Sequence, residues 1–278
     1  MELLEAIDMH VHFGPDPHLQ RSVTAYQAAV QARDAGHGGI VLKSHDFSTM
    51  GVASAINEIL PGLDVFGGIC CDTSIGGLNV QAVQDALGIG AAIVWMPTLS
   101  VKADWERYGR ARGVPAPGLQ ICHQGSLVTQ ALEIIALVAQ HGRLLATGHI
   151  SIEEHLAVAA AMPPGGKLIV THAMDRQCGP GDEMNVEVLK ELVNRGAVVE
   201  FCAGTAIGAH ATRTVAEIAA AIRTIGVGKC VLSTDFGQAF NPLPVEGLSN
   251  FADRLAEHGF SIAELRRMTA DNPRALLS

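Results

Sequence analysis

Apolar residues along this chain gather into short runs that recur at regular intervals. The runs are rich in Val, Ile and Leu, and they cover residues 6–13, 38–45, 64–70, 91–98, 143–150, 167–174, 197–203 and 230–236. Near-continuous apolar runs of this length are typical of parallel strands that are buried on both faces. The pattern therefore predicts eight parallel strands.

The segments between these runs carry helix start and stop signals. Gly36, Gly142 and Gly196 stand where three of the helices are expected to end. Capping-box pairs, in which side chains satisfy the free amides of a first helical turn, occur at Thr24 and Gln27, Ser151 and Glu154, Thr214 and Glu217, and Ser261 and Glu264.

Eight strand–helix units in 278 residues predict one α/β domain, a (β/α)8 TIM barrel that spans residues 1–278. A doubly wound open sheet is the structural alternative. No G-x-G-x-x-G motif follows the first strand, which disfavours that alternative. One connection is unusually long: residues 99–126, after the fourth strand, and loops of this length are usually functional or disordered.

Polar side chains stand where five of the predicted strands end. These are His10 and His12, Lys43 and His45, His149, His172, and Asp235. Side chains alternate along a strand, so His10 and His12 lie on the same face of the first strand. Lys43 and His45 likewise lie on the same face of the second strand. In a barrel, the inward residues at the carboxyl ends of the strands converge on one site.

A single histidine or lysine at a strand end is more often a solvated rim residue than a ligand. Five such strands are a different matter, because isolated polar groups in apolar strands are costly to bury and need a shared partner. A divalent cation is the simplest partner. Imidazole nitrogens and a carboxylate suit Zn²⁺, while Mn²⁺, Fe²⁺ and Ni²⁺ are alternatives.

This ordered set resembles the amidohydrolase superfamily of metal-dependent barrel hydrolases. The tail "MTADNPRALLS", residues 268–278, is similar to an ending common in that superfamily. The resemblance implies that His10, His12, His149 and His172 are metal ligands. It also implies hydrolysis by metal-activated water, with Asp235 as a ligand and as the catalytic general base and acid.

The chain departs from the superfamily pattern at the fourth strand. Many two-metal members carry a carboxylated lysine there, but "AAIVWMPT" at 91–98 contains no lysine. Lys43 on the second strand faces the same way, and two hypotheses remain open for it. It bridges the ions, as a carbamate, or it stays a cation that holds substrate or balances a carboxylate. The number of ions, one or two, depends on this residue.

Other acidic residues are candidates for supporting roles. Glu200, embedded in the seventh apolar run, is a candidate for orienting a histidine. Asp8 shares a face with His10 but lies deeper in the barrel, and we expect it to be structural. Asp72, just past the third strand, is a weaker candidate.

Candidate substrate contacts are His45, Arg21, Arg176 and His123. Arginine binds carboxylates through a bidentate fork, so a carboxylate on a small-molecule substrate is one expectation; surface charges on solvated loops are the alternative. The expected reaction is hydrolysis of a C–N or C–O bond of a cyclic amide, imide or lactone. The alternatives are a phosphoesterase, a metal-free lactonase or decarboxylase on the same barrel, and a non-enzymatic binding barrel.

Composition and net charge disfavour some classes of binding partner. A net charge of −9 argues against nucleic acid or an anionic membrane as the main partner. No apolar run is long enough to span a bilayer, and the N-terminus lacks signal-peptide features, so we expect a cytoplasmic protein. The six cysteines form no C-x-x-C pair and are expected to be free thiols. Alanine-rich helices leave a homo-oligomer open.

Overall fold

The computed structural model describes residues 1–106, 110, 118–177 and 184–278. Its strands are arranged in two parallel sheets. The first has the order β1 (Ile7–His12), β2 (Gly39–Lys43), β3 (Asp64–Phe66). The second, larger sheet has the order β11 (Cys230–Ser233), β10 (Val198–Cys202), β9 (Lys167–Val170), β8 (Leu144–Ala146), β5 (Ile93–Trp95), β4 (Gly68–Cys70).

The two sheets form one closed barrel. β3 and β4 are consecutive, separated only by Gly67, so the third strand pairs first with β2 and then with β5. On the other side, the amide of His12 donates to the carbonyl of Phe236 at 2.8 Å, and the amide of Asp235 donates to the carbonyl of His10 at 2.9 Å. Counting β3 and β4 as one, the described part of the chain has eight parallel strands around the barrel. The predicted TIM barrel is confirmed, with shorter strands than the apolar runs.

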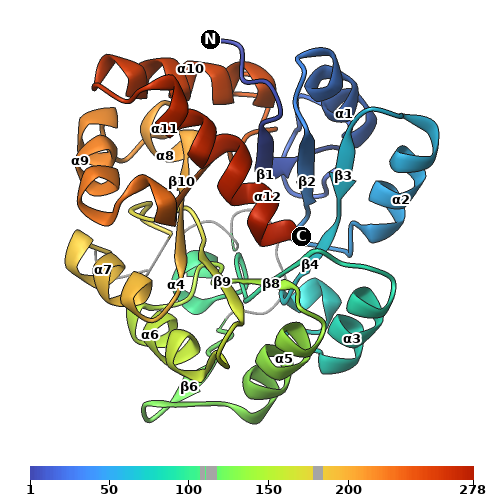
Figure 1. Cartoon of the computed structure of the whole chain (residues 1–278). Coiled ribbons are helices and arrows are strands. Elements are labelled where there is room, and N and C mark those ends of the chain that lie inside the picture. The colour runs from blue at the N-terminus through green and yellow to red at the C-terminus, as the bar shows by residue number, and fades with distance from the viewer. Residues whose placement is uncertain (107–109, 111–117, 178–183) are drawn as a thin grey trace.

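Helices surround the strands on the outside (Figure 1). The helices between strands are α1 (Ala25–Asp34), α2 (Met50–Ile59), α3 (Val80–Gly88), α5 (Thr129–Gln140), α6 (Ile152–Ala161), α7 (Val186–Asn194) and α9 (Val215–Ile225). The chain ends in α10 (Pro244–Glu257), α11 (Ile262–Arg266) and α12 (Asn272–Leu277). All four predicted capping boxes form, at the starts of α1, α6, α9 and α11.

Short elements fill the connections. α4 (Lys102–Asp104) lies in the long connection after β5, α8 (Ala203–Ala206) follows β10, and β6 (Cys122–His123) pairs with β7 (Ser126–Leu127) in an antiparallel hairpin. Three further short helical turns are Thr73–Ile75, Val227–Lys229 and Arg267–Asp271. The five described cysteines are free thiols. No helix in the described ranges is long and apolar enough to cross a bilayer.

The hydrophobic core has an inner and an outer layer. The inner layer fills the barrel with residues such as Ile7, Ile93 and Trp95, and Leu277 of α12 joins it. α12 lies across the end of the barrel that faces the viewer in Figure 1. The outer layers pack the strands against the helices. The end of the barrel filled by α12 is thus closed by apolar packing, and the polar residues lie toward the other end.

A β-bulge in β1 decides which side chains enter the barrel. The pairing of β1 with β2 shifts register between Asp8 and Val11. Ile7 and Met9 pack in the inner layer, but Val11 packs in the outer layer. Bulges re-aim side chains and are common next to active sites. Here the bulge directs His10 inward directly above Met9.

The bulge corrects one expectation. Asp8 does not share a face with His10, because the alternation is broken between the two residues. Its carboxylate instead accepts hydrogen bonds from the amide of Thr234 at 3.0 Å, from the Thr234 hydroxyl at 2.5 Å, and from the His10 amide at 3.2 Å. Asp8 therefore ties β1 to the end of β11, which is a structural role.

Candidate metal centre

Five histidine rings form a closed circle above the inner core. The distances between ring centroids are 5.3 Å for His10–His12, 5.0 Å for His12–His45, 6.2 Å for His45–His149, 4.7 Å for His149–His172 and 5.8 Å for His172–His10. All five side chains are buried. They come from β1 and from the carboxyl ends of β2, β8 and β9, so the barrel itself brings them together.

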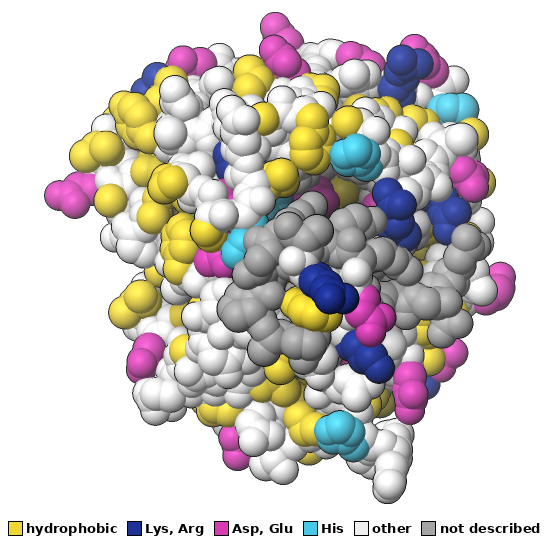
Figure 2. Space-filling model, turned by 180° about the vertical axis from the view of Figure 1, so that it is seen from behind, with side chains coloured by type: hydrophobic (Ala, Val, Ile, Leu, Met, Phe, Trp, Pro, Cys, Tyr) yellow, Lys and Arg dark blue, Asp and Glu magenta, His cyan; other side chains and the backbone are white. Residues whose placement is uncertain are grey.

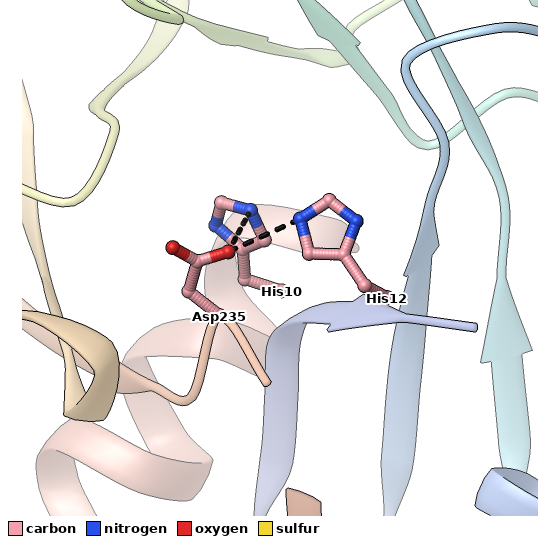
Figure 3. Close-up of side chains that lie close together, drawn as sticks. All are labelled: His10, His12 and Asp235. Carbon is pink, nitrogen blue, oxygen red and sulfur yellow. Dashed lines mark ion pairs between the residues drawn. The ribbon is translucent and has the colours of Figure 1, made fainter. Parts of the chain in front are cut away.

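Asp235 lies against this circle. Its Oδ1 atom is 3.2 Å from Nε2 of His10 and 3.1 Å from Nε2 of His12. Figure 3 shows one carboxylate oxygen facing a nitrogen of both rings. Burial raises the pKa of the Asp235 carboxyl, but the contacts with His10 and His12 outweigh this and hold the pKa well below its usual range. Asp235 is therefore an anion.

The backbone is strained at two members of this group. His172 has a φ of 25° and Asp235 a φ of 55°, in the left-handed region that non-glycine residues rarely adopt. Such conformations cost free energy and cluster at functional sites. Here they direct two side chains toward the circle at the ends of β9 and β11.

Acidic groups outside the circle set the orientation of two rings. Nδ1 of His10 is 3.3 Å from Oε2 of Glu200, and Nδ1 of His149 is hydrogen-bonded to the carboxylate of Asp104. An ionised carboxylate can only accept a hydrogen bond, so each Nδ1 must donate. An imidazole that carries its single proton on Nδ1 has its lone pair on Nε2, which is the arrangement of metal-ligating histidines.

His45 is held in a similar way through an intermediate hydroxyl. Its Nδ1 is 2.7 Å from Oγ1 of Thr98 and 3.6 Å from Oδ2 of Asp72. The Thr98 hydroxyl donates to Asp72, so it accepts from His45. Burial raises the pKa of Asp72, but His45, Thr98 and the Ser100 amide lower it to about 2. Nε2 of His45 therefore also carries the lone pair.

A further contact joins the rings of His149 and His172. Nε2 of His149 lies 2.9 Å from Nε2 of His172. Burial lowers the pKa of His12, His45, His149 and His172 below the ordinary histidine value. These side chains are thus neutral imidazoles at neutral pH, which is the form that binds metal.

These donors fit a divalent cation. The ligand atoms of His10, His12 and Asp235 lie within 4.8 Å of one another, and nitrogen with carboxylate oxygen is a suitable set for zinc. Two other groups contain His10, Glu200 and Cys202, and His45, Cys70 and Asp72. Their carboxylates already accept backbone amides, from His172 in the first group and from Thr98 and Ser100 in the second. His10, His12 and Asp235 are therefore the candidate centre, with His149 and His172 beside them.

Lys43 lies at the same level as the histidines. Only 1% of the residue is exposed, and Nζ is 5.4 Å above the ring of Trp95. Nζ has no hydrogen-bond partner among the residues that the structure describes. A buried amine nitrogen without a hydrogen-bond partner is costly, which makes Lys43 a candidate for contact with a bound group.

A cavity of about 320 Å³ opens above the centre. Its walls include Lys43, His45, His149 and Asp235, together with Leu19, Arg21, Arg176 and Phe240 from the surrounding loops. Arg21 has only 5% of its side chain exposed. Asp16 accepts from Nε and Nη2 of Arg21 at 2.9 and 2.6 Å, while Nη1 is buried without a partner among the described residues.

The structure does not bring the fourth predicted substrate residue to this cavity. His123 is exposed on β6, and Gln124 and Gly125, both with positive φ, form the hairpin turn that separates it from Ser126. In the view from behind (Figure 2), the Lys and Arg side chains lie mostly on the right half of the face, with acidic side chains among them.

Sequence reasoning missed Asp104 and ranked Asp72 too low. Asp104 lies in the long connection after β5, whose length was the one available signal. Gln177, Gln238 and Asn241, which also line the cavity or contact Asp104, gave no signal, because amides in loops are common.

Several enzymes of known structure share the fold of this chain. An amidohydrolase from Pseudomonas aeruginosa has a TM-score of 0.69 at 12% identity, over 98% of this chain and 95% of that one. The probable dipeptidase PvdM from the same organism has a TM-score of 0.68 at 10% identity, over 99% and 94%. A 2,6-dihydroxybenzoate decarboxylase from Rhizobium has a TM-score of 0.57 at 11% identity, over 100% and 99%.

At these identities the likeness is one of fold, and at that level it confirms the resemblance seen in the sequence. No curated protein matches the chain. Residues 5–200 match a family described as a family of unknown function, DUF6282. The chain belongs to that family.

Proposed function

We propose that this protein is a metal-dependent hydrolase that cleaves a C–N or C–O bond of a small molecule, of the cyclic amide, imide or lactone type. The observation that carries the proposal is the circle of five buried imidazoles closed by Asp235 at one end of the barrel. His10, His45 and His149 present lone pairs at Nε2, and the contact between His149 and His172 can satisfy that of His149 alone. A shared cation explains all of them together.

His10, His12, His149, His172 and Asp235 would hold the ion or ions, most simply Zn²⁺, with Mn²⁺, Fe²⁺ or Ni²⁺ as alternatives. A bound divalent cation supplies a lower pKa for coordinated water and polarises a substrate carbonyl. Glu200 and Asp104 keep His10 and His149 in the ligating tautomer. The neighbouring proteins of known structure include enzymes named as an amidohydrolase and dipeptidases, which supports a hydrolytic reaction.

Asp235 is the proposed general base and acid. It is anionic, and one edge of its carboxylate is fixed between His10 and His12, so it can receive a proton from the attacking water and pass it to the leaving group. It also lines the cavity, which supports a role next to a bound substrate. General acid–base catalysis of this kind contributes about 10²- to 10⁴-fold to a rate.

The Asp235→Asn variant tests this role. We expect it to fold, because the side chain keeps its shape, and to lose at least about 10³-fold in kcat/KM, because an amide cannot accept the proton. Turnover is measured on a panel of lactones, cyclic imides and cyclic amides. Asp175→Asn, which changes a different acid in the wall of the same cavity, is the matched control. Activity of Asp235→Asn within about tenfold of wild type would show that the assigned role is wrong.

The substrate is proposed to carry a carboxylate that binds Arg21. Asp16 holds one edge of the guanidinium group and leaves Nη1 buried in the wall of the cavity without a partner among the described residues. Arg176 and His45 also line this cavity and are proposed as further substrate contacts. The apolar side chains of Leu19, Leu99 and Phe240 in the same wall suit an apolar substrate body, and the cavity volume suits a small molecule.

The Arg21→Met variant tests the carboxylate contact. Methionine keeps much of the apolar stem but lacks the charge, so kcat/KM for an acid substrate should fall about 10- to 100-fold, which corresponds to the loss of a charge-assisted hydrogen bond. The methyl ester of the same substrate should be unaffected by the change. The exposed Arg254→Met serves as the control. An equal loss on acid and ester would contradict the assignment.

Lys43 is proposed to be a carbamate when the centre is loaded. The neutral amine adds to CO2 and releases one proton, which turns the buried amine into an anion with oxygen donors. Two facts support this choice over a permanent ammonium: Nζ has no acceptor among the described residues, and Lys43 lines the same cavity as His45, His149 and Asp235. The carbamate would give a two-ion centre its bridging ligand.

Carbon-13 NMR of protein loaded with zinc in ¹³C-bicarbonate tests the modification. We expect a carbamate signal in wild type that is lost in Lys43→Arg, because a guanidinium group does not form one. The control is Lys190→Arg, which changes an exposed lysine of α7. If wild type and Lys43→Arg give the same spectrum, Lys43 is a cation and the centre holds a single ion.

Decarboxylation of the same acid is the second candidate. It is favoured by the Arg21 site and by the decarboxylase among the proteins of the same fold. The two reactions differ in product, since only decarboxylation releases CO2 from the carboxylate that Arg21 is proposed to bind.

A further inference from the structure

The connection after β5 returns one acid to the interior of the protein. Asp104, the last residue of α4, is completely buried. Its carboxylate accepts a hydrogen bond from Nδ1 of His149 and another, at 3.2 Å, from Nε2 of Gln177. Gln177 belongs to the connection after β9, so residues from two loops meet on this carboxylate, directly behind a ring of the candidate metal centre.

The segment that carries Asp104 is fixed at its start by a second buried acid. Asp72 accepts the amides of Thr98 and Ser100, both at 2.9 Å, and the Thr98 hydroxyl that it also binds is the partner of His45. Residues 98–105 thus contact the centre twice, through Thr98 to His45 and through Asp104 to His149. The orientation of two rings depends on where this segment lies.

The position of this segment depends in turn on metal binding. A buried carboxylate is costly unless it is hydrogen-bonded, and the imidazole of His149 is one of its donors. A cation bound at Nε2 makes Nδ1–H a stronger donor, because it withdraws electron density from the ring. Binding at the centre therefore strengthens the bond that holds Asp104, and by linkage the docked segment strengthens binding.

We propose that Asp104 is a positioning residue that couples docking of residues 98–105 to metal binding at the His149 side of the centre. The inference rests on the proposed metal-dependent function and goes beyond it. Asp104, which is not a metal ligand, would contribute to the affinity for the metal. The order of residues 98–105 would in turn depend on the bound ion.

The Asp104→Asn variant tests the coupling, with Glu106→Gln as the matched control, because Glu106 is an exposed acid of the same connection. Zinc affinity is measured on metal-stripped protein by competition with a chromophoric chelator. We expect Asp104→Asn to bind zinc about 10- to 100-fold more weakly, the usual effect of losing such a partner, and Glu106→Gln to match wild type.

Hydrogen exchange of peptides that cover residues 98–106 supplies the second readout. In wild type, zinc should slow exchange in these peptides, whereas in Asp104→Asn it should not. A merely structural role for Asp104 would raise exchange equally with and without zinc and leave the zinc affinity unchanged, and that result overturns the inference.

A further variant keeps the test decisive. If Asp104→Asn does not fold, Gln177→Ala removes the hydrogen bond from Gln177 to Asp104 and should weaken zinc binding by a smaller factor in the same direction. No change in the zinc affinity of Gln177→Ala would then overturn the inference.

If wild type binds zinc and Asp104→Asn binds it equally well, the coupling fails while the proposed function stands. If wild type binds no divalent ion, both fail.

Discussion

The rest of the site depends on one constraint, the placement of the proton on each buried imidazole. A neutral histidine has one nitrogen that donates and one that accepts, and a neighbour decides which is which. Glu200 and Asp104 accept from Nδ1 of His10 and His149, and the Thr98 hydroxyl accepts from Nδ1 of His45. All three rings therefore present a lone pair at Nε2. Without these acceptors the histidines would gain nothing from being buried together.

The barrel architecture meets this constraint by local departures from regular structure. The bulge in β1 turns His10 inward, and the left-handed backbone at His172 and Asp235 directs two more side chains to the same place. Asp8 ties the end of β11 to β1 beneath them. Each departure is costly in isolation and is explained by the site it builds. The apolar inner layer, which Leu277 closes at the other end of the barrel, stabilises the fold. This packing offsets the free-energy cost of the departures at the polar end.

Much of this arrangement could be predicted from the sequence, because it follows from periodic patterns. Apolar runs gave the eight strands, capping pairs gave the helix starts, and polar residues after the apolar runs gave the histidine circle and Asp235. The bulge could not be predicted, because regular alternation is the only rule that a strand sequence supplies. That rule placed Asp8 on the wrong face. Asp104 could not be found either, since nothing local links it to His149, a residue 45 positions further along.

His123 shows the opposite case, because the sequence around it indicates the hairpin that carries it. Gln124 and Gly125 lie between two short apolar stretches, and a two-residue turn that ends in glycine is typical of a hairpin. The hairpin holds His123 away from the cavity. Arg21 differs, because Asp16 five residues earlier fixes it in the wall of the cavity.

Diffraction from crystals grown with zinc, recorded at the zinc absorption edge, tests the central claim most directly. The account predicts anomalous density inside the circle of His10, His12, His45, His149 and His172, in contact with Asp235. It predicts that the same density is absent when the crystals are grown with a chelator. Zinc density only at exposed surface residues, with the circle unchanged, would contradict the account.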